Sequence, residues 1–348
     1  TLLYNTYSDV ATFIAPTTIT SENNKKKVIA SDGYYDAKNR KTYLGKRPTI
    51  QDGTVFLTAD EVATDDSTGF GEARGNVIYN DTAQHVMVIA NNMKSNNKNK
   101  SFLATERPVL ILKQGEDSIF VAADTLYSAR LSNLLKYRTV PFLKDSLTAK
   151  DTSFADDDST DRFFEAYYHV KIYSDSLQAM GDSLFYSAKD SIFRLFKKPV
   201  VWAKENQVTG DTIYLYTQNK KPSRLYVFEN ALAINKVGSN YYNQIKGRTL
   251  NGYFTDGNID RMRVKGNSES VYYAQDDYNK FVGVNKSTAD IIDMYFNDRK
   301  PQRVVFRSSL SGTSYPMRKV DHTAIRLRGF TWLDDLRPKT KYDLFGDF

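Results

Sequence analysis

A short motif recurs along this chain at intervals close to thirty residues, and this repetition constrains the fold more than any other feature. The template is the stretch Asp-Ser-Leu-Gln-Ala-Met-Gly-Asp-Ser-Leu-Phe-Tyr at 175–186. A repeat of this length indicates one supersecondary unit that buries its apolar face against its neighbours. One polar position aligns across the copies, at residues 32, 60, 92, 124, 182, 211, 248 and 290.

Each unit has a second half in which a small residue, proline or asparagine precedes an alternating apolar stretch. Proline is tolerated at the first position of a strand, where its missing N–H costs the ladder least. The high aromatic content of 13% also favours strands. The second halves begin at Arg47-Pro48, Gly75-Asn76, Arg107-Pro108, His169-Val170, Lys198-Pro199 and Glu229-Asn230.

The apolar phase shifts by one residue inside each motif. Leu177 and Ala179 share one face of a strand, whereas Leu184 and Tyr186 continue the apolar pattern from an even position. A shift at a Gly-Asp step is typical of a bulge or a strand corner. We therefore expect an all-β fold, an elongated jellyroll or taco-shaped tube of about ten stacked strand pairs with two facing sheets.

The repeat texture predicts one continuous array over residues 1–320, and the first residues already read as the middle of a strand. Residues 143–162 are too charged and too poor in apolar side chains to pack, so we expect a flexible acidic insertion there. Residues 321–348 leave the pattern, and we expect them to form a C-terminal cap, centred on 330–333, followed by a polar tail.

The side chains needed for catalysis or metal binding are not arranged for either. The chain has no cysteine, and His85, His169 and His322 are isolated from one another in sequence. Each unit offers one aspartate, too few for calcium repeats, so we expect the aspartates to cap backbone groups at the corners. We expect no enzyme activity, no catalytic residue, no metal and no cofactor.

The net charge of +7 has two interpretations. It fits an ordinary solvated surface, and it also fits attraction to an anionic partner. No motif typical of nucleic-acid binding accompanies it, so we expect no nucleic-acid partner.

Four segments together resemble the OstA-like family, which contains the lipopolysaccharide-transport protein LptA and the N-terminal domain of LptD. They are residues 71–79, 175–186, 202–213 and 224–231. The resemblance implies a periplasmic or outer-membrane-associated bridge component whose groove binds the lipid A acyl chains of lipopolysaccharide. It also implies partners among other lipopolysaccharide-transport proteins, through pairing of end strands, and a head-to-tail homo-oligomer.

In the family such a groove is lined by apolar side chains, so the resemblance assigns groove residues to this chain by their position in the repeat and not by residue identity. A filled core would show the same alternation, so the competing function is a structural or carbohydrate-binding scaffold at the cell surface. The candidate groove residues are Leu177, Ala179, Leu184, Tyr186, Val200, Trp202, Val208, Ile213, Leu215, Leu225, Val227, Leu232 and Ile234.

Overall fold

The computed structural model describes residues 1–20, 25–114, 117–140, 160–218, 221–256, 258–297 and 300–345. Nearly all regular structure in these residues is antiparallel β, which confirms the expected all-β fold. The chain divides into two compact units. Unit 1 holds residues 1–170, 185–190 and 340–348, and unit 2 holds residues 171–184 and 191–339.

Unit 1 contains two hydrogen-bonded ladders. Ladder A comprises β1 (Leu2–Asn5), β2 (Val10–Phe13), β5 (Asp32–Asp36), β6 (Lys41–Gly45), β9 (Glu61–Asp65), β12 (Ser101–Thr105), β15 (Thr125–Ala129) and the start of β16 (Phe163–Tyr173). Ladder B comprises β3 (Thr17–Thr20), β4 (Lys26–Ala30), β7 (Thr49–Asp52), β8 (Val55–Thr58), β13 (Val109–Gln114) and β14 (Asp117–Ala122). The long strands β10 (Phe70–Asp81) and β11 (Val86–Asn96) take part in both ladders.

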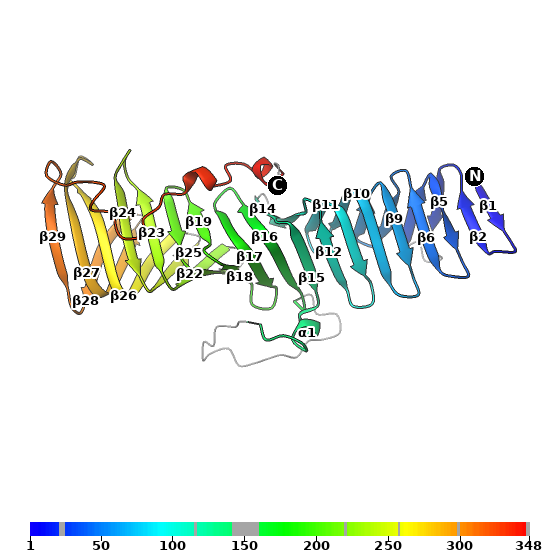
Figure 1. Ribbon diagram of the computed structural model, residues 1–348, viewed down its shortest axis with the longest axis horizontal. Helices are drawn as coiled ribbons and strands as arrows, with labels where there is room; N and C mark the ends of the chain where they lie inside the picture. Colours follow the sequence, from blue (N-terminus) through cyan, green and yellow to red (C-terminus); the bar gives the residue numbers. More distant parts are fainter. Residues whose placement is uncertain are drawn as a thin grey trace. The chain divides into compact units, whose positions relative to one another are not determined.

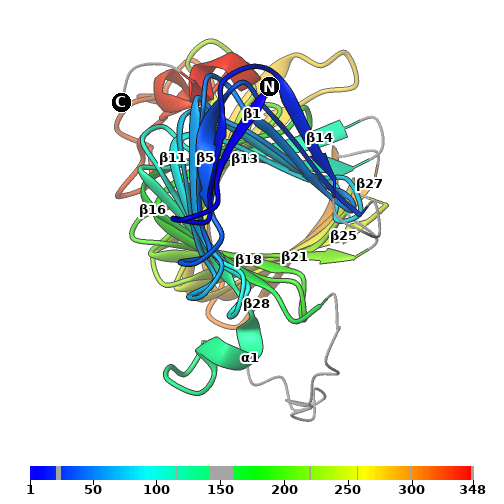
Figure 2. The same cartoon turned by 90° about the vertical axis from the view of Figure 1, so that its right-hand side faces the viewer.

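Figure 1 shows the ladder A strands of unit 1 side by side, and Figure 2 shows the blue and cyan strands forming two walls that meet at an angle. The chain runs out and back in one ladder, turns a corner, and then runs out and back in the other. Strand β10 makes this crossing without a break, with a register shift between Arg74 and Val77. The phase shift seen in the sequence is therefore the passage between ladders.

Unit 2 repeats this arrangement. Its ladder A contains β18 (Ile192–Phe196), β21 (Thr212–Gln218), β22 (Lys221–Phe228), β25 (Thr249–Thr255) and β28 (Lys300–Arg307). Its ladder B contains β19 (Val200–Ala203), β20 (Asn206–Thr209), β23 (Ala231–Lys236), β24 (Tyr242–Gly247) and β29 (Ser311–Pro316). The strands β26 (Asn258–Gln275) and β27 (Phe281–Asn297) contribute to both. The strand β17 (Gln178–Ser187) pairs with β19 in ladder B, and its last residues, 185–187, belong to unit 1.

The aligned polar positions lie at the corners that lead from ladder B into ladder A. There the amide of Asp60 donates to the carbonyl of Gly75 at 2.8 Å, and the amide of Asp211 donates to Glu229 at 3.1 Å. In the third copy the equivalent bond is made by Asn91, which donates to Glu106 at 3.0 Å, so the alignment on residue 92 was wrong by one position. Each polar corner is thus joined to the next corner along the chain.

The corners that lead from ladder A into ladder B use left-handed backbone. Lys46 and Arg47 have φ of 54° and 60°, and Glu229 and Asn230 have φ of 49° and 52°. Such residues cost roughly 1–2 kcal/mol each relative to the right-handed region, so their recurrence indicates that the surrounding ladders impose the turn. These are the Pro and Asn punctuation sites of the sequence.

The corner aspartates bind side chains of the neighbouring corner rather than capping their own backbone as we expected. Asp60 accepts from Arg47 at 2.9 Å and from Asn76 at 2.8 Å, and Asp211 accepts from Asn230 at 2.9 Å. The hydrogen bond from Arg47, followed by that from Asn76, lowers the pKa of Asp60 below its usual value. The described residues contain no group of carboxylates and histidines able to hold a metal ion.

The segment after β29 lies along the outer face of ladder B in unit 2, where Figure 1 shows it in red beside β19, β23 and β24. Three buried glutamines on alternate strands of one cross-strand row hold it. Gln244 accepts from the amide of Leu327 at 2.9 Å, and Gln178 accepts from Arg337 at 2.7 Å. Gln207 donates to the carbonyl of Thr331 and accepts from the amide of Leu333, both at 2.7 Å.

Three short helical turns complete the described structure. The helix α1 (Leu131–Leu134) follows β15, η1 (Asp334–Leu336) lies in the C-terminal segment of unit 2, and η2 (Lys341–Leu344) packs against β14 in unit 1. Residues 141–159, which include most of the expected insertion, lie outside the described residues. No helix of the described chain is long and apolar enough to cross a membrane.

Candidate functional site

The interior between the two ladders of unit 1 is defined by side chains that cluster across the corner. Val62 and Met93 of ladder A pack in one cluster with Ile50, Leu57 and Tyr79 of ladder B. Because side chains alternate between faces, these contacts identify which face of every paired strand points inward.

Two inward rows of cross-strand partners run through unit 1. They consist of apolar residues and one glycine, and they alternate with outward residues such as Ile78. In ladder A the row is Phe13, Gly33, Leu44, Val62, Ala73, Met93, Ala104, Leu126 and Ala166. In ladder B it is Ile19, Val28, Ile50, Leu57, Tyr79, Val88, Leu110 and Val121.

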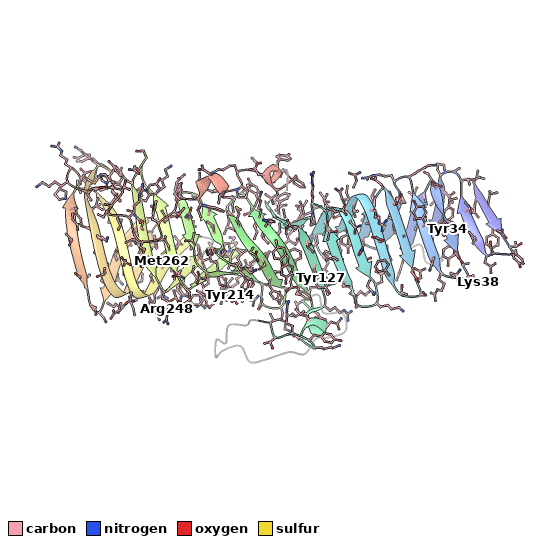
Figure 3. All side chains as sticks on the ribbon, viewed as in Figure 1. Tyr34, Lys38, Tyr127, Tyr214, Arg248 and Met262 are labelled. Carbon is pink, nitrogen blue, oxygen red and sulfur yellow. The ribbon has the colours of Figure 1, made fainter. Side chains whose placement is uncertain are left out.

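The inward face of ladder A in unit 2 carries two successive rows of apolar cross-strand partners. The row nearest the corners is completely buried at Ile213, Val227, Leu250, Val264 and Ile292. The next row on the same inward face, two residues farther from the corners, is Phe193, Leu215, Leu225, Gly252, Met262, Met294 and Val304. Met262, labelled in Figure 3, is half-buried.

The two rows differ in exposure. Ile213 and its row partners are 0% exposed, whereas in the next row Phe193 and Leu225 are buried, Leu215 is half-buried and Val304 is 38% exposed. Side chains close to the corners therefore fill the interior, and part of the next row leaves apolar surface accessible. Tyr79 is the titratable member of the inward rows in unit 1, and burial raises the pKa of its hydroxyl, which keeps it neutral.

The structure places nine of the thirteen candidate groove residues on the inward face. Their offsets from the corners match those of the inward residues in unit 1, as Ile213 and Val62 show by each following a corner aspartate by two positions. The nine are Leu177, Ala179, Leu184, Tyr186, Val208, Ile213, Leu215, Leu225 and Val227.

The other four, Val200, Trp202, Leu232 and Ile234, lie on the opposite face of their strands. Leu232 and Ile234 pack in one cluster with Ile325 and Leu327 of the C-terminal segment. Trp202 is completely buried and donates its indole N–H to Gln207 at 3.3 Å. These residues therefore form the core beneath the C-terminal segment, so the structure does not bring them together with the other nine.

Several inward residues were missed from the sequence although the motif contained their signal. An apolar residue follows most polar corners by two positions, as at Val62, Leu126, Leu250 and Ile292. Applying that offset would have found these four residues, although at Asp32 it leads to the exposed Tyr34 and not to the inward Gly33.

No protein-family model matches this sequence, and no curated protein matches it. Among solved structures, the chain is similar to LptH from Pseudomonas aeruginosa, described as the LptA homologous periplasmic component of the conserved lipopolysaccharide transport device. The identity is 13%, the TM-score is 0.20, and the match covers 49% of this chain and 80% of that one. An identity and a TM-score this low support no conclusion about function. The inward rows are the observation that bears on function.

Proposed function

We propose that this protein binds lipid acyl chains along its inward rows and acts as a bridge component of lipopolysaccharide transport in the periplasm. The observation that carries the proposal is the unbroken row of apolar cross-strand partners from Ile19 to Tyr79 in ladder B of unit 1, whose side chains are half-buried or exposed and therefore accessible to an acyl chain. The apolar row through Leu215 and Met262 extends the same character to unit 2.

The physical basis is simple. Burial of each CH₂ group contributes about 0.8 kcal/mol, so an acyl chain is held without any specific hydrogen bond. A repeat presents many similar contacts at a spacing of about 4.8 Å between strands, so a bound chain can pass between sites of similar free energy. Lipopolysaccharide and other transport proteins, joined through end strands such as β1, are the partners that this function requires.

Adjacent residues on opposite faces allow a direct test. A photo-crosslinking amino acid at Tyr79 or Leu215, which point inward, should form adducts with purified lipopolysaccharide. The same amino acid at Ile78, which points outward and is 38% exposed, should not. Deacylated lipopolysaccharide serves as the ligand control and should give no adduct at any site. Equal labelling at Ile78 and Tyr79, or labelling that survives deacylation, would contradict the proposal.

The second candidate function is a structural scaffold, and the complete burial of Ile213, Val227, Leu250, Val264 and Ile292 favours it. A scaffold needs only this filled core. It predicts no adduct at Leu215 or Tyr79, so the same experiment separates the two functions.

A further inference from the structure

The outer face of ladder A in unit 2 carries a row of cross-strand partners in which tyrosine and arginine alternate. The row crosses β21, β22, β25, β26, β27 and β28 at Tyr216, Arg224, Tyr253, Arg261, Tyr295 and Arg303, and we call it the Arg–Tyr row. It lies on the face opposite Met262, whose chain neighbours Arg261 and Arg263 point outward.

Each arginine of the Arg–Tyr row stacks on a neighbouring tyrosine. The guanidinium carbon of Arg261 lies 4.6 Å from the ring centre of Tyr253, and that of Arg303 lies 4.4 Å from the ring centre of Tyr295. Arg224 lies 5.2 Å from the ring centre of Tyr216 and is further held by Asn251, to which its Nη2 donates at 2.7 Å. Stacking fixes the guanidinium plane while leaving its N–H edges able to donate.

The positive charge of this face is not balanced within it. In the segments of β21, β22, β25, β26, β27 and β28 that pair in ladder A, Asp260 and Asp293 are the only carboxylates among the described residues; Glu269 and Asp290 lie outside those segments, in the ladder B part of β26 and at the corner of β27. Asp293 is completely buried and already bound by Arg263 and Arg307. Arg261 and Arg303 form no ion pair with any described residue.

The arginines of the row recur on every second strand. Neighbouring strands lie about 4.8 Å apart, so successive guanidinium groups lie roughly 10 Å apart on a line across the strands. A line one residue wide matches an extended polymer better than the broad surface of a membrane. Bidentate hydrogen bonds from arginine suit carboxylates and other planar or tetrahedral anions.

We propose that the Arg–Tyr row binds an acidic polysaccharide that lies across the strands of unit 2. The anionic groups of the polymer are bound by Arg261 and Arg303, which stack on Tyr253 and Tyr295, while Arg224 adds positive charge to the row and is held by Asn251. This surface is on the opposite face of the strands from the inward rows, so the inference is independent of acyl-chain binding.

The test uses the full chain and polygalacturonate as the acidic polymer, with neutral dextran as the polymer control. The double variant Arg261→Gln/Arg303→Gln should bind polygalacturonate at least tenfold more weakly in calorimetry at moderate salt. The matched control Lys38→Gln/Lys41→Gln removes two exposed charges from unit 1 and should change the Kd less than twofold. Unchanged thermal midpoints will show that both variants fold.

The variant Arg261→Lys/Arg303→Lys keeps the charge but loses the planar stack and bidentate geometry. It should bind at least threefold more weakly than the wild type. Wild-type affinity in this variant or in the glutamine variant would overturn the proposal. An absence of wild-type binding to polygalacturonate would also overturn the proposal. The same holds if the wild type binds phosphatidylglycerol vesicles and the glutamine variant weakens that binding as much as it weakens binding to polygalacturonate.

Discussion

Protonation of Asp293 should destabilise unit 2, because this buried carboxylate pairs with two arginines, Arg263 and Arg307. It is 0% exposed and accepts hydrogen bonds from Arg263 at 2.8 Å and Arg307 at 2.9 Å. The hydrogen bonds from Arg263, opposed by burial and reinforced by Arg307, lower the pKa of Asp293 from 3.8 to about 2. This lowering of the pKa in the folded state corresponds to about 2 kcal/mol of folding free energy at neutral pH.

The direction of the pH effect follows from the lowered pKa. The ionised carboxylate stabilises the folded state fully above the unfolded-state pKa of about 3.9, and this stabilisation is lost as the pH falls toward 2. The variant Asp293→Asn should therefore be about 2 kcal/mol less stable than the wild type at pH 7. The difference should shrink toward zero near pH 2, where the wild-type side chain is also becoming neutral.

Tryptophan fluorescence during urea unfolding is the appropriate assay, since Trp202 and Trp332 are the two tryptophans and both belong to unit 2. The matched control is Asp256→Asn, whose carboxylate is 85% exposed and lies 3.6 Å from Lys221. An exposed pair of this kind contributes about 0–1 kcal/mol. A gap between wild type and Asp293→Asn that stays constant from pH 7 to pH 2, or no gap at pH 7, would refute the reasoning.

Three further substitutions test the packing of the two units. Gln207→Leu should cost about 2–4 kcal/mol, because it removes the side chain that accepts from the buried indole N–H of Trp202 and binds the partly buried amide of Leu333 and carbonyl of Thr331. Tryptophan fluorescence in urea should show this loss, and the exposed Gln84→Leu should show almost none. Gly210→Ala should cost about 1–3 kcal/mol through overpacking, since its Cβ would lie 2.2 Å from Val227. Gly181→Ala, before the preceding corner, meets nothing closer than 3.5 Å and should unfold like the wild type in the same assay. Leu344→Ala should destabilise unit 1 by about 2–4 kcal/mol, because Leu344 is completely buried. Circular dichroism during thermal unfolding should show this loss as a lower midpoint. A wild-type midpoint for Gln207→Leu, Gly210→Ala or Leu344→Ala would contradict the contact that the variant removes or crowds.

The repeat itself was readable from the sequence because its causes are local. The shift of apolar phase at Gly210-Asp211 and the punctuation at Lys198-Pro199 both mark places where the chain changes ladder. Strand identity followed from period 2 and aromatic content, which depend on neighbouring residues only. The all-β fold and the positions of most corners were therefore predictable, although the corner at Asn91 was misplaced by one residue.

The direction in which each face points was decided by the tertiary structure. Val200, Val201 and Trp202 are consecutive and all buried, so alternation could not show which of them faces the interior. The C-terminal segment, more than a hundred residues away in sequence, covers Trp202 through Gln207.

The same limit applies to the outer face of ladder A. Arg224, Tyr253, Arg261 and Tyr295 are unremarkable one by one in the sequence, and only the register of four paired strands aligns them in a row. Pairing register depends on contacts between residues distant in sequence. Local sequence therefore determined that this chain forms stacked strand pairs with corners, and the packing of distant segments decided which apolar residues face inward and which charges meet.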